Sequence, residues 1–236
     1  MTGYKAIASA ILAGMLKIVL TSDLHGYQPE IEPCDLLVIA GDVCPISHSN
    51  PLVHQHDPHA QRDWILTEFN DWLSEQPAKQ TVWIGGNHDF GLELAGMRRE
   101  IRRTFPKNTH YLHDEAIEVF GNVLYGTPWC PTLRSWAFYA TDDTFKRLAA
   151  DIPTDTDILV LHSPPAGCFL DNRYGAPHMM EEIIKRVKPK LVVCGHIHEG
   201  YGDHEILGVR FINASYMDIN YDADKPQPPV VVELEQ

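Results

Sequence analysis

Side chains that can bind a metal ion lie at or near the ends of five apolar runs in this sequence. The runs read KIVLTSDLH (17–25), LLVIAGD (36–42), TVWIGGNHD (81–89), ILVLH (158–162) and LVVCGHIH (191–198). The candidate ligands are Asp23, His25, Asp42, Asn87, His162, His196 and His198. A mixed set of nitrogen and oxygen donors suits Mn, Fe or Zn better than Ca or Mg, which prefer oxygen alone. The sequence therefore predicts a metalloenzyme.

The carboxylates in this set indicate two ions and a phosphate substrate. Asp23 and His25 are two positions apart, so in an extended segment both side chains point the same way and can bind one ion. Asp42 can give one oxygen to each of two ions. Two divalent ions bring a charge of +4, and Asp23, Asp42 and a bridging hydroxide remove three, which leaves about +1 to attract a phosphate oxygen. This charge favours a phosphate ester as substrate.

The elements that position these residues follow from the periodicity. An open α/β sheet gathers its ligands beyond the carboxyl ends of its strands, so the five apolar runs are expected to be strands. Helical spacing is found in 61–76, where five apolar residues share one face, and in 93–104, 141–149 and 178–187. Further strands are expected in 116–128, as a pair around Gly121, and in 204–215 and 229–235. Two sheets packed together and flanked by helices would contain all of these elements.

Length and composition are consistent with one domain. The chain has 236 residues, of which 44% are hydrophobic, enough to bury a substantial core. We expect a single domain over 15–236 and an N-terminal extension, disordered or from a non-native start, over 1–14. The segment AIASAILAGML (6–16) resembles the apolar part of a signal peptide but is shorter than the roughly 20 residues that span a bilayer. Because Met15 is itself a natural start, we favour an extension over an export signal.

Net charge and cysteine content indicate which binding partners and which cellular compartment to expect. The net charge of −13, without a basic run, disfavours bulk nucleic-acid binding, although a metal pair could make a cleft locally positive. No membrane partner is expected, and the sequence leaves the oligomeric state open. Five cysteines without a CxxC pair fit neither a disulfide framework nor a structural zinc site. We therefore expect a reducing compartment, the cytoplasm.

The order of the motifs resembles that of the calcineurin-like metallophosphoesterases. DLH (23–25), GD (41–42), GNHD (86–89), the lone His162 and GHIH (195–198) carry the resemblance, which runs from about Lys17 to the C-terminus. It implies a four-layer αββα sandwich, two mixed sheets flanked by helices, with a dinuclear metal site. By this resemblance Asp23, His25, Asp42 and His198 hold the first ion, and Asp42, Asn87, His162 and His196 hold the second. His88 would protonate the leaving oxygen, while a hydroxide between the ions attacks phosphorus. Asp89 would lie nearby to orient His88, although an acid that follows a functional histidine can also simply hold the loop.

Further stretches of the sequence indicate which branch of this family the chain resembles. GDVCP lacks the VDRG of the phosphoprotein phosphatases, whereas TPWCP, HSPPAG (162–167) and GHIHEGYG (195–202) are similar to the small MPPED-type members. That branch is associated with phosphodiesters such as cyclic nucleotides. We therefore expect a phosphodiesterase with two divalent transition-metal ions, Mn before Fe or Zn. A phosphomonoesterase, phosphoprotein phosphatases included, and a non-catalytic scaffold of the same fold are the alternatives.

Candidate substrate contacts lie in TPWCPTLRSWAF (127–138). Arg134 could clamp a phosphate and Trp129, or Trp136, could stack on a base, although tryptophans beside prolines often only pack a loop. Cys44 and Cys194 flank ligands, but small buried hydrophobes are the simpler interpretation. The histidines of the long polar loop after Asp42, which are His48, His54, His56 and His59, are expected to be solvated.

Overall fold

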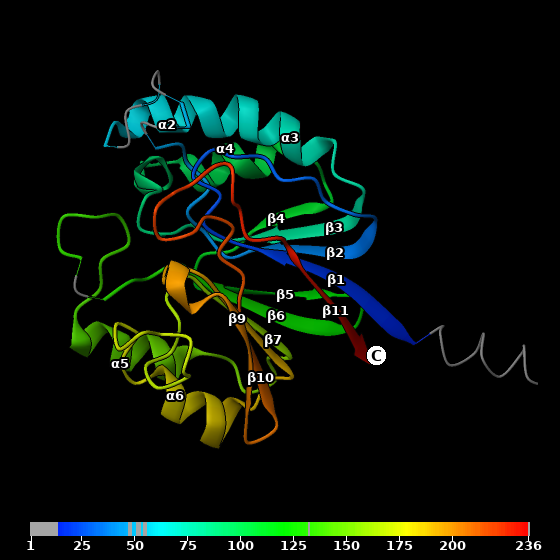
Figure 1. The fold of residues 1–236 in the computed structure, drawn as a ribbon, viewed down its shortest axis with the longest axis vertical. Coiled ribbons are helices and arrows are strands. Elements are labelled where there is room, and N and C mark those ends of the chain that lie inside the picture. The colour runs from blue at the N-terminus through cyan, green and yellow to red at the C-terminus, as the bar shows by residue number, and fades with distance from the viewer. Residues whose placement is uncertain (1–13, 47–48, 51–52, 54–55, 132, 236) are drawn as a thin grey trace, which may run out of the picture.

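Two β-sheets stacked face to face form the centre of the molecule (Figure 1). The structure is a computed structural model that describes residues 14–46, 49–50, 53, 56–131 and 133–235. Almost all of the expected N-terminal extension lies outside these ranges. The strand predicted from the first motif begins at Met15.

The first sheet carries the first three motifs. Its order is β11 (Val230–Glu235), β1 (Met15–Thr21), β2 (Cys34–Ile39), β3 (Ala78–Trp83) and β4 (Thr109–Tyr111). Strands β1 to β4 are parallel and β11 is antiparallel to β1. The carboxyl ends of β1, β2 and β3 therefore lie side by side.

The second sheet carries the last two motifs. Its order is β5 (Glu115–Val119), β6 (Asn122–Thr127), β7 (Ile158–Leu161), β8 (Leu191–Cys194), β10 (Val209–Asn213) and β9 (Gly202–Ile206). Strands β6, β7, β8 and β10 are parallel, and the two edge strands are antiparallel. Both sheets are thus mixed, as predicted.

Helices cover the outer face of each sheet (Figure 1). Over the first sheet lie α2 (Pro58–Trp64), η1 (Ile65–Phe69), α3 (Asn70–Ser74), η2 (Phe90–Glu93) and α4 (Met97–Thr104). Over the second lie α5 (Asp142–Asp151), α6 (Met179–Glu182) and η3 (Ile183–Val187). A short turn, η4 (His198–Gly200), follows β8. The predicted helix at 93–104 begins only at Met97, because Leu94 is extended and Gly96 is left-handed.

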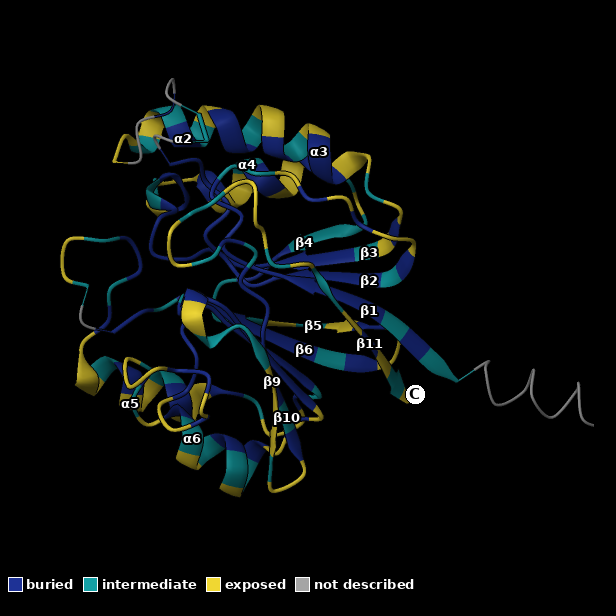
Figure 2. Ribbon diagram, in the orientation of Figure 1, coloured by how far each residue is buried: buried dark blue, intermediate teal, exposed yellow. Residues whose placement is uncertain are grey.

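Alternation along the strands divides the core into three layers. In β1, Leu16, Ile18 and Leu20 point between the sheets, whereas Val19 packs beneath the helices. The second helical layer packs on the other sheet around Phe145. Figure 2 shows the buried strands enclosed by helices with exposed outer faces. The predicted four-layer αββα sandwich is confirmed.

The two sheets meet where β1 and β10 end. Ser22 and Ser215 form a parallel bridge, and the Tyr216 N–H donates to the Ser22 carbonyl oxygen over 2.8 Å. The loops that leave both sheets at this edge therefore face one another, and the motif residues lie on these loops.

Candidate metal centre

All seven predicted ligands gather at this edge, in two overlapping clusters. In the first cluster, Asp23 Oδ1 lies 3.3 Å from His198 Nε2, and His25 Nε2 lies 3.4 Å from the same nitrogen. In the second, His162 Nε2 lies 3.1 Å from Asn87 Oδ1, and the rings of His162 and His196 are 5.2 Å apart between centroids.

Asp42 lies between the two clusters. Its Oδ2 is 3.2 Å from His162 Nε2 and 4.0 Å from His25 Nε2. Each cluster thus has an imidazole that faces the same carboxylate. This is the position that a carboxylate shared by two ions must occupy.

Several ligands have an unusual backbone conformation. Asp23, His25, Asp42 and His196 have positive φ angles of 52°, 47°, 53° and 66°. Such a conformation costs about 1–3 kcal/mol for a residue with a Cβ and persists only where the surroundings enforce it. Here the Asp23 N–H donates to the Gly41 carbonyl oxygen and the His25 N–H to that of Asp42, both over 2.9 Å. The loops after β1 and β2 therefore hold each other in the conformation that aims the ligands inward.

Outer hydrogen bonds orient the imidazoles. His162 Nδ1 lies 2.7 Å from the Ala40 carbonyl oxygen, and His198 Nδ1 lies 2.9 Å from that of Asp218. A proton on each Nδ1 leaves Nε2 free to coordinate an ion, which is the arrangement typical of metal-binding histidines. The Asp23 carboxylate is held by the Ser215 hydroxyl, which donates over 2.9 Å, and by the His196 N–H.

The buried charges perturb each other strongly. Burial opposes ionisation of Asp23 and Asp42, yet hydrogen bonds and charge from His198 and His162 hold the pKa of both carboxyls below the usual range. Burial lowers the pKa of those two imidazoles, but Asp42 raises the pKa of His162 to about 9, and Asp23 raises that of His198 to about 9.

The remaining two imidazoles titrate in the opposite direction. Burial lowers the pKa of His25 to about 3 and that of His196 to about 4. Both are therefore neutral near pH 7, the state in which imidazole binds metals.

The donor set fits divalent cations. Asp23, His25 and His198 have ligand atoms within 4.8 Å of one another, as do Asp23, Asp42 and His162. Among the described residues, the buried His25 Nδ1 and His88 Nδ1 have no hydrogen-bond partner. Two divalent cations would supply positive charge beside the buried carboxylates of Asp23 and Asp42.

The metal-free protein should lose stability as pH rises above 6.5. The raised pKa values of His162 and His198 mean that both hold protons more tightly in the folded state, so their stabilisation is complete below 6.5 and is lost as pH rises through about 9. Asp89 acts in the same direction, because burial and the charge of Asp42 raise its pKa to about 7. Thermal melting of chelator-treated protein across this range measures the effect. His162→Gln should flatten the slope, and a melting temperature that rises with pH would contradict the assignment.

Gly86 leaves room for two of the ligands. A Cβ at this position would lie 2.4 Å from Asp42 Oδ1 and 2.6 Å from His162 Nε2. We expect Gly86→Ala to displace these side chains and to weaken metal binding by about tenfold to a hundredfold, the usual cost of disturbing ligand orientation. Competition with a chelator measures the affinity. Gly14→Ala is the matched control, because its Cβ would meet no atom within 4 Å; equal affinities in both variants would contradict the prediction.

His88 also lies at the centre, because its ligand atom is within 4.8 Å of those of His25 and Asp42. Its N–H donates to Asp42 Oδ1 over 2.7 Å, and its Nε2 lies 4.0 Å from Asp42 Oδ2. The Gln61 amide donates to the His88 carbonyl oxygen over 2.7 Å and so holds this loop against α2. The ring lies 4.3 Å from that of Trp136 and 4.6 Å from that of His25, between centroids.

The contacts of Asp89 match the second of its two expected roles, which is to hold the loop. Its carboxylate accepts from the N–H groups of Val43, Cys44 and Gly86 over 3.3, 2.8 and 2.8 Å, and His88 Nδ1 has no partner among the described residues. Asp89 therefore joins the loops after β2 and β3 and does not orient the imidazole. A buried carboxylate is drawn to backbone donors because they satisfy its lone pairs.

The predicted substrate contacts lie elsewhere. A cavity of about 230 Å³ opens onto the centre, lined by Asp42, Asn87, His88, Leu133, Trp136, His196, His198 and Tyr221. Trp129 is absent from this lining, because its indole N–H donates to the Asp114 carboxylate over 3.0 Å. Arg134 is exposed and lines a separate groove beside Thr141. Of the tryptophans in this loop, Trp136 is the one that faces the centre.

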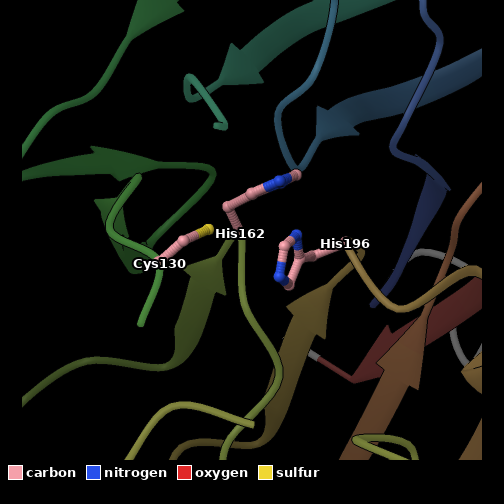
Figure 3. Close-up of side chains that lie close together, drawn as sticks. All are labelled: Cys130, His162 and His196. Atoms are coloured by element: carbon pink, nitrogen blue, oxygen red, sulfur yellow. The ribbon is translucent and has the colours of Figure 1, made fainter. Parts of the chain in front are cut away.

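Sequence reasoning missed Tyr221 and Cys130. Tyr221 lies 5.0 Å from His25 and 4.9 Å from His198 between ring centroids, on the loop that follows β10. Cys130 follows β6, and Figure 3 shows its side chain pointing toward His162. Both come after parallel strands whose ends carry no charged motif. The only feature of the sequence that could have pointed to Tyr221 and Cys130 is that each follows the end of a predicted strand.

The loop histidines are only partly described. His48 and His54 lie outside the described residues. His56 and His59 are exposed, as expected, although the His56 ring also lies 5.2 Å from the rings of Trp136 and Phe90, between centroids. His59 is in the first turn of α2.

Comparison with known proteins agrees with this geometry. The sequence model of the calcineurin-like phosphoesterases matches residues 16–200. The chain belongs to this family. Proteins of this family hydrolyse phosphoesters with divalent metal ions, and the centre contains the candidate residues that could hold such ions.

Similar proteins place the chain near the MPPED-type branch of the family, as expected. Human metallophosphoesterase domain-containing protein 1 is 29% identical, over 94% of this chain and 72% of that protein. The UPF0046 protein T07D4.2 of Caenorhabditis elegans is 29% identical over 93% and 60%. The crystal structure of phosphopantetheinyl hydrolase from Mycobacterium tuberculosis superposes with a TM-score of 0.57, at 16% identity over 92% and 95% of the two chains. No helix among the described residues is long and apolar enough to cross a membrane.

Proposed function

We propose that this protein is a phosphodiesterase that hydrolyses a small phosphodiester, such as a cyclic nucleotide, with two divalent transition-metal ions, Mn before Fe or Zn. The first ion would be held by Asp23, His25, Asp42 and His198, and the second by Asp42, Asn87, His162 and His196. Asp42 is the shared ligand in this assignment, which the distances from its Oδ2 to imidazoles of both clusters support.

The residues that line the cavity are the main support for a diester substrate. Among the described residues that line it, none is lysine or arginine, and two are large aromatic side chains, Trp136 and Tyr221. A phosphomonoester carries about −1.5 to −2 near pH 7 and would gain from cationic clamps. A diester carries a single negative charge and therefore needs fewer such clamps. Its second organic group can lie against the aromatic side chains.

Each group of residues has a different role in the proposed reaction. When bound, the metal pair activates the attacking water and attracts the phosphate oxygens. His162 and His198 keep their orientation because backbone carbonyls accept from Nδ1. We assign to His88 the transfer of a proton to the leaving oxygen, since it lines the cavity and is outside the two proposed ligand sets. Leu133 and Trp136 give the cavity an apolar part of its lining.

The test compares two aryl substrates that release the same product. Chelator-stripped protein should hydrolyse bis(p-nitrophenyl) phosphate with a higher kcat/KM than p-nitrophenyl phosphate once Mn²⁺, Fe²⁺, Zn²⁺ or Mg²⁺ is restored singly. Trp136→Leu should reduce this preference by up to about tenfold, the usual value of an aromatic contact. Trp129→Leu, in the same loop, should leave it unchanged. Preference for the monoester would establish a phosphatase, and no turnover with any ion would support a scaffold.

We also propose that the protein acts in the cytoplasm. All five cysteines are free and buried in the structure. Free thiols in this number are typical of proteins from a reducing compartment. Fractionation of cells that express the tagged protein tests this proposal, and recovery in a secreted fraction would overturn it.

A further inference from the structure

Cys130 differs from the other cysteines in its surroundings. Cys34 and Cys44 pack in the hydrophobic core beneath one helical layer, and Cys168 and Cys194 pack in the core beneath the other. Cys130 is 0% exposed but belongs to none of the hydrophobic clusters of the described residues. Burial among apolar side chains, the ordinary explanation for a buried cysteine, therefore does not account for Cys130.

The thiol faces the ligands of the second ion. Its sulfur and the ring nitrogens of His162 and His196 lie within 4.8 Å of one another, and its sulfur lies 3.8 Å from Asn87 Oδ1. In Figure 3 the side chain extends from the loop after β6 toward His162, with the His196 ring beside it. Ligands of one zinc-sized ion lie about 2.0–2.3 Å from the metal and hence up to about 4.4 Å from each other. The four side chains thus come close to the dimensions of a single coordination shell.

Strand order explains how the sulfur reaches this position. β6 and β8 flank β7 in the second sheet, so the loops that carry Cys130 and His196 lie on either side of His162. The Cys130 N–H donates to the Phe138 carbonyl oxygen over 2.9 Å, and the Cys130 carbonyl oxygen accepts from the Ala140 N–H over 3.0 Å. These bonds fix the backbone of Cys130 while its side chain stays directed at the centre.

We propose that Cys130 is a sulfur ligand of the second metal position and makes this position selective for a thiophilic ion such as Zn²⁺ over Mn²⁺. The proposal rests on the proposed metal centre. On binding, the thiol releases its proton to solvent as the sulfur–metal bond forms, so a divalent ion and a thiol give a metal thiolate and one proton. A thiolate is a soft ligand, whereas the first position, with two carboxylates and two imidazoles, offers only oxygen and nitrogen. The preference for Mn²⁺ proposed above then applies to the first position alone, and the centre would hold two different ions.

Cobalt substitution tests the sulfur ligand without relying on activity. Chelator-stripped protein loaded with two equivalents of Co²⁺ should show the near-ultraviolet charge-transfer band of a sulfur–cobalt bond. Cys130→Ser should lose the band, whereas Cys168→Ala, a change at another buried cysteine, should keep it. Cys130→Ser should also weaken Zn²⁺ binding at the second position by at least about tenfold, with a smaller effect on Mn²⁺.

Several results would contradict the sulfur assignment, and they can be told apart from a failure of the proposed function. Two bound Co²⁺ ions without the band in the wild-type protein would overturn the sulfur assignment. This test uses only the wild-type protein, so it does not depend on whether a variant folds. A band that survives in Cys130→Ser would overturn it as well. Weaker Zn²⁺ binding in Cys130→Ser, with no band in the wild type, would show that the thiol only donates to Asn87. Failure of the wild-type protein to bind any ion would overturn the proposed function together with this assignment.

Discussion

Replacing Asp42 with alanine is expected to remove both metal ions and to lower kcat/KM by at least about 10³-fold. The carboxylate faces His25 in one cluster and His162 in the other, so its loss opens both coordination shells at once. The metal pair is worth several kcal/mol of transition-state stabilisation, and each 1.4 kcal/mol corresponds to about a factor of ten in rate. Metal analysis of the purified variant, combined with kinetics on the diester, measures both effects.

Two further variants separate metal binding from folding. Asp42→Asn keeps the shape of the side chain and an oxygen that can accept from the His88 N–H, so it should fold while it still loses affinity for both ions. Asp203→Ala removes a partly exposed carboxylate that pairs with Arg210 in the second sheet and should keep two ions and full activity. Retention of two ions by Asp42→Ala would show that another residue bridges them.

His88→Ala is expected to keep both ions and to slow turnover by about 10²- to 10⁴-fold, the usual value of a positioned proton donor. His88 contacts Asp42 through its backbone N–H, which alanine retains. Burial lowers the pKa of His88, which makes its protonated form a stronger acid. The proton matters most when the leaving alkoxide is a strong base. The rate loss should therefore be large for alkyl esters and small for p-nitrophenyl esters.

A series of diesters with leaving groups of increasing pKa tests this role. The plot of log kcat against leaving-group pKa should become steeper in His88→Ala than in the wild type. His178→Ala, which removes an exposed histidine near α5, serves as the control and should leave the slope unchanged. Parallel plots for wild type and His88→Ala would exclude proton donation by His88.

The sequence predicts that the candidate ligands lie together because each of them follows the end of a strand. Each apolar run stops where the chain leaves the sheet, and parallel pairing brings the ends of β1, β2 and β3 to one edge. Residues in irregular loops lack such a rule. Trp129 and Trp136 lie in one loop, and the positive φ of Phe138 together with the bridge between Cys130 and Tyr139 shapes its path. That path, which no periodicity encodes, directs Trp136 to the cavity.

Hydrogen bonding was equally hidden from the sequence. An acid that follows His88 suggests a pair with that imidazole, but the backbone N–H groups of two loops compete for the same carboxylate and bind it in the structure. Tyr221 is another case. Its backbone is left-handed at φ 55°, and its N–H donates to the same Asp218 carbonyl oxygen that His198 Nδ1 faces. Only the folded loop shows that one carbonyl positions both rings.

The division of the ligands between the two sheets has a consequence for biosynthesis. Each proposed ion takes ligands from loops of the first sheet and of the second, because His198 completes the first position and His162 and His196 complete the second. A nascent chain that has emerged only as far as β5 carries the proposed ligands from the first sheet but none from the second. It therefore cannot enclose either ion. Enclosure of either proposed ion must therefore wait until synthesis has passed residue 196 for the second position and 198 for the first, when strands of both sheets have been made.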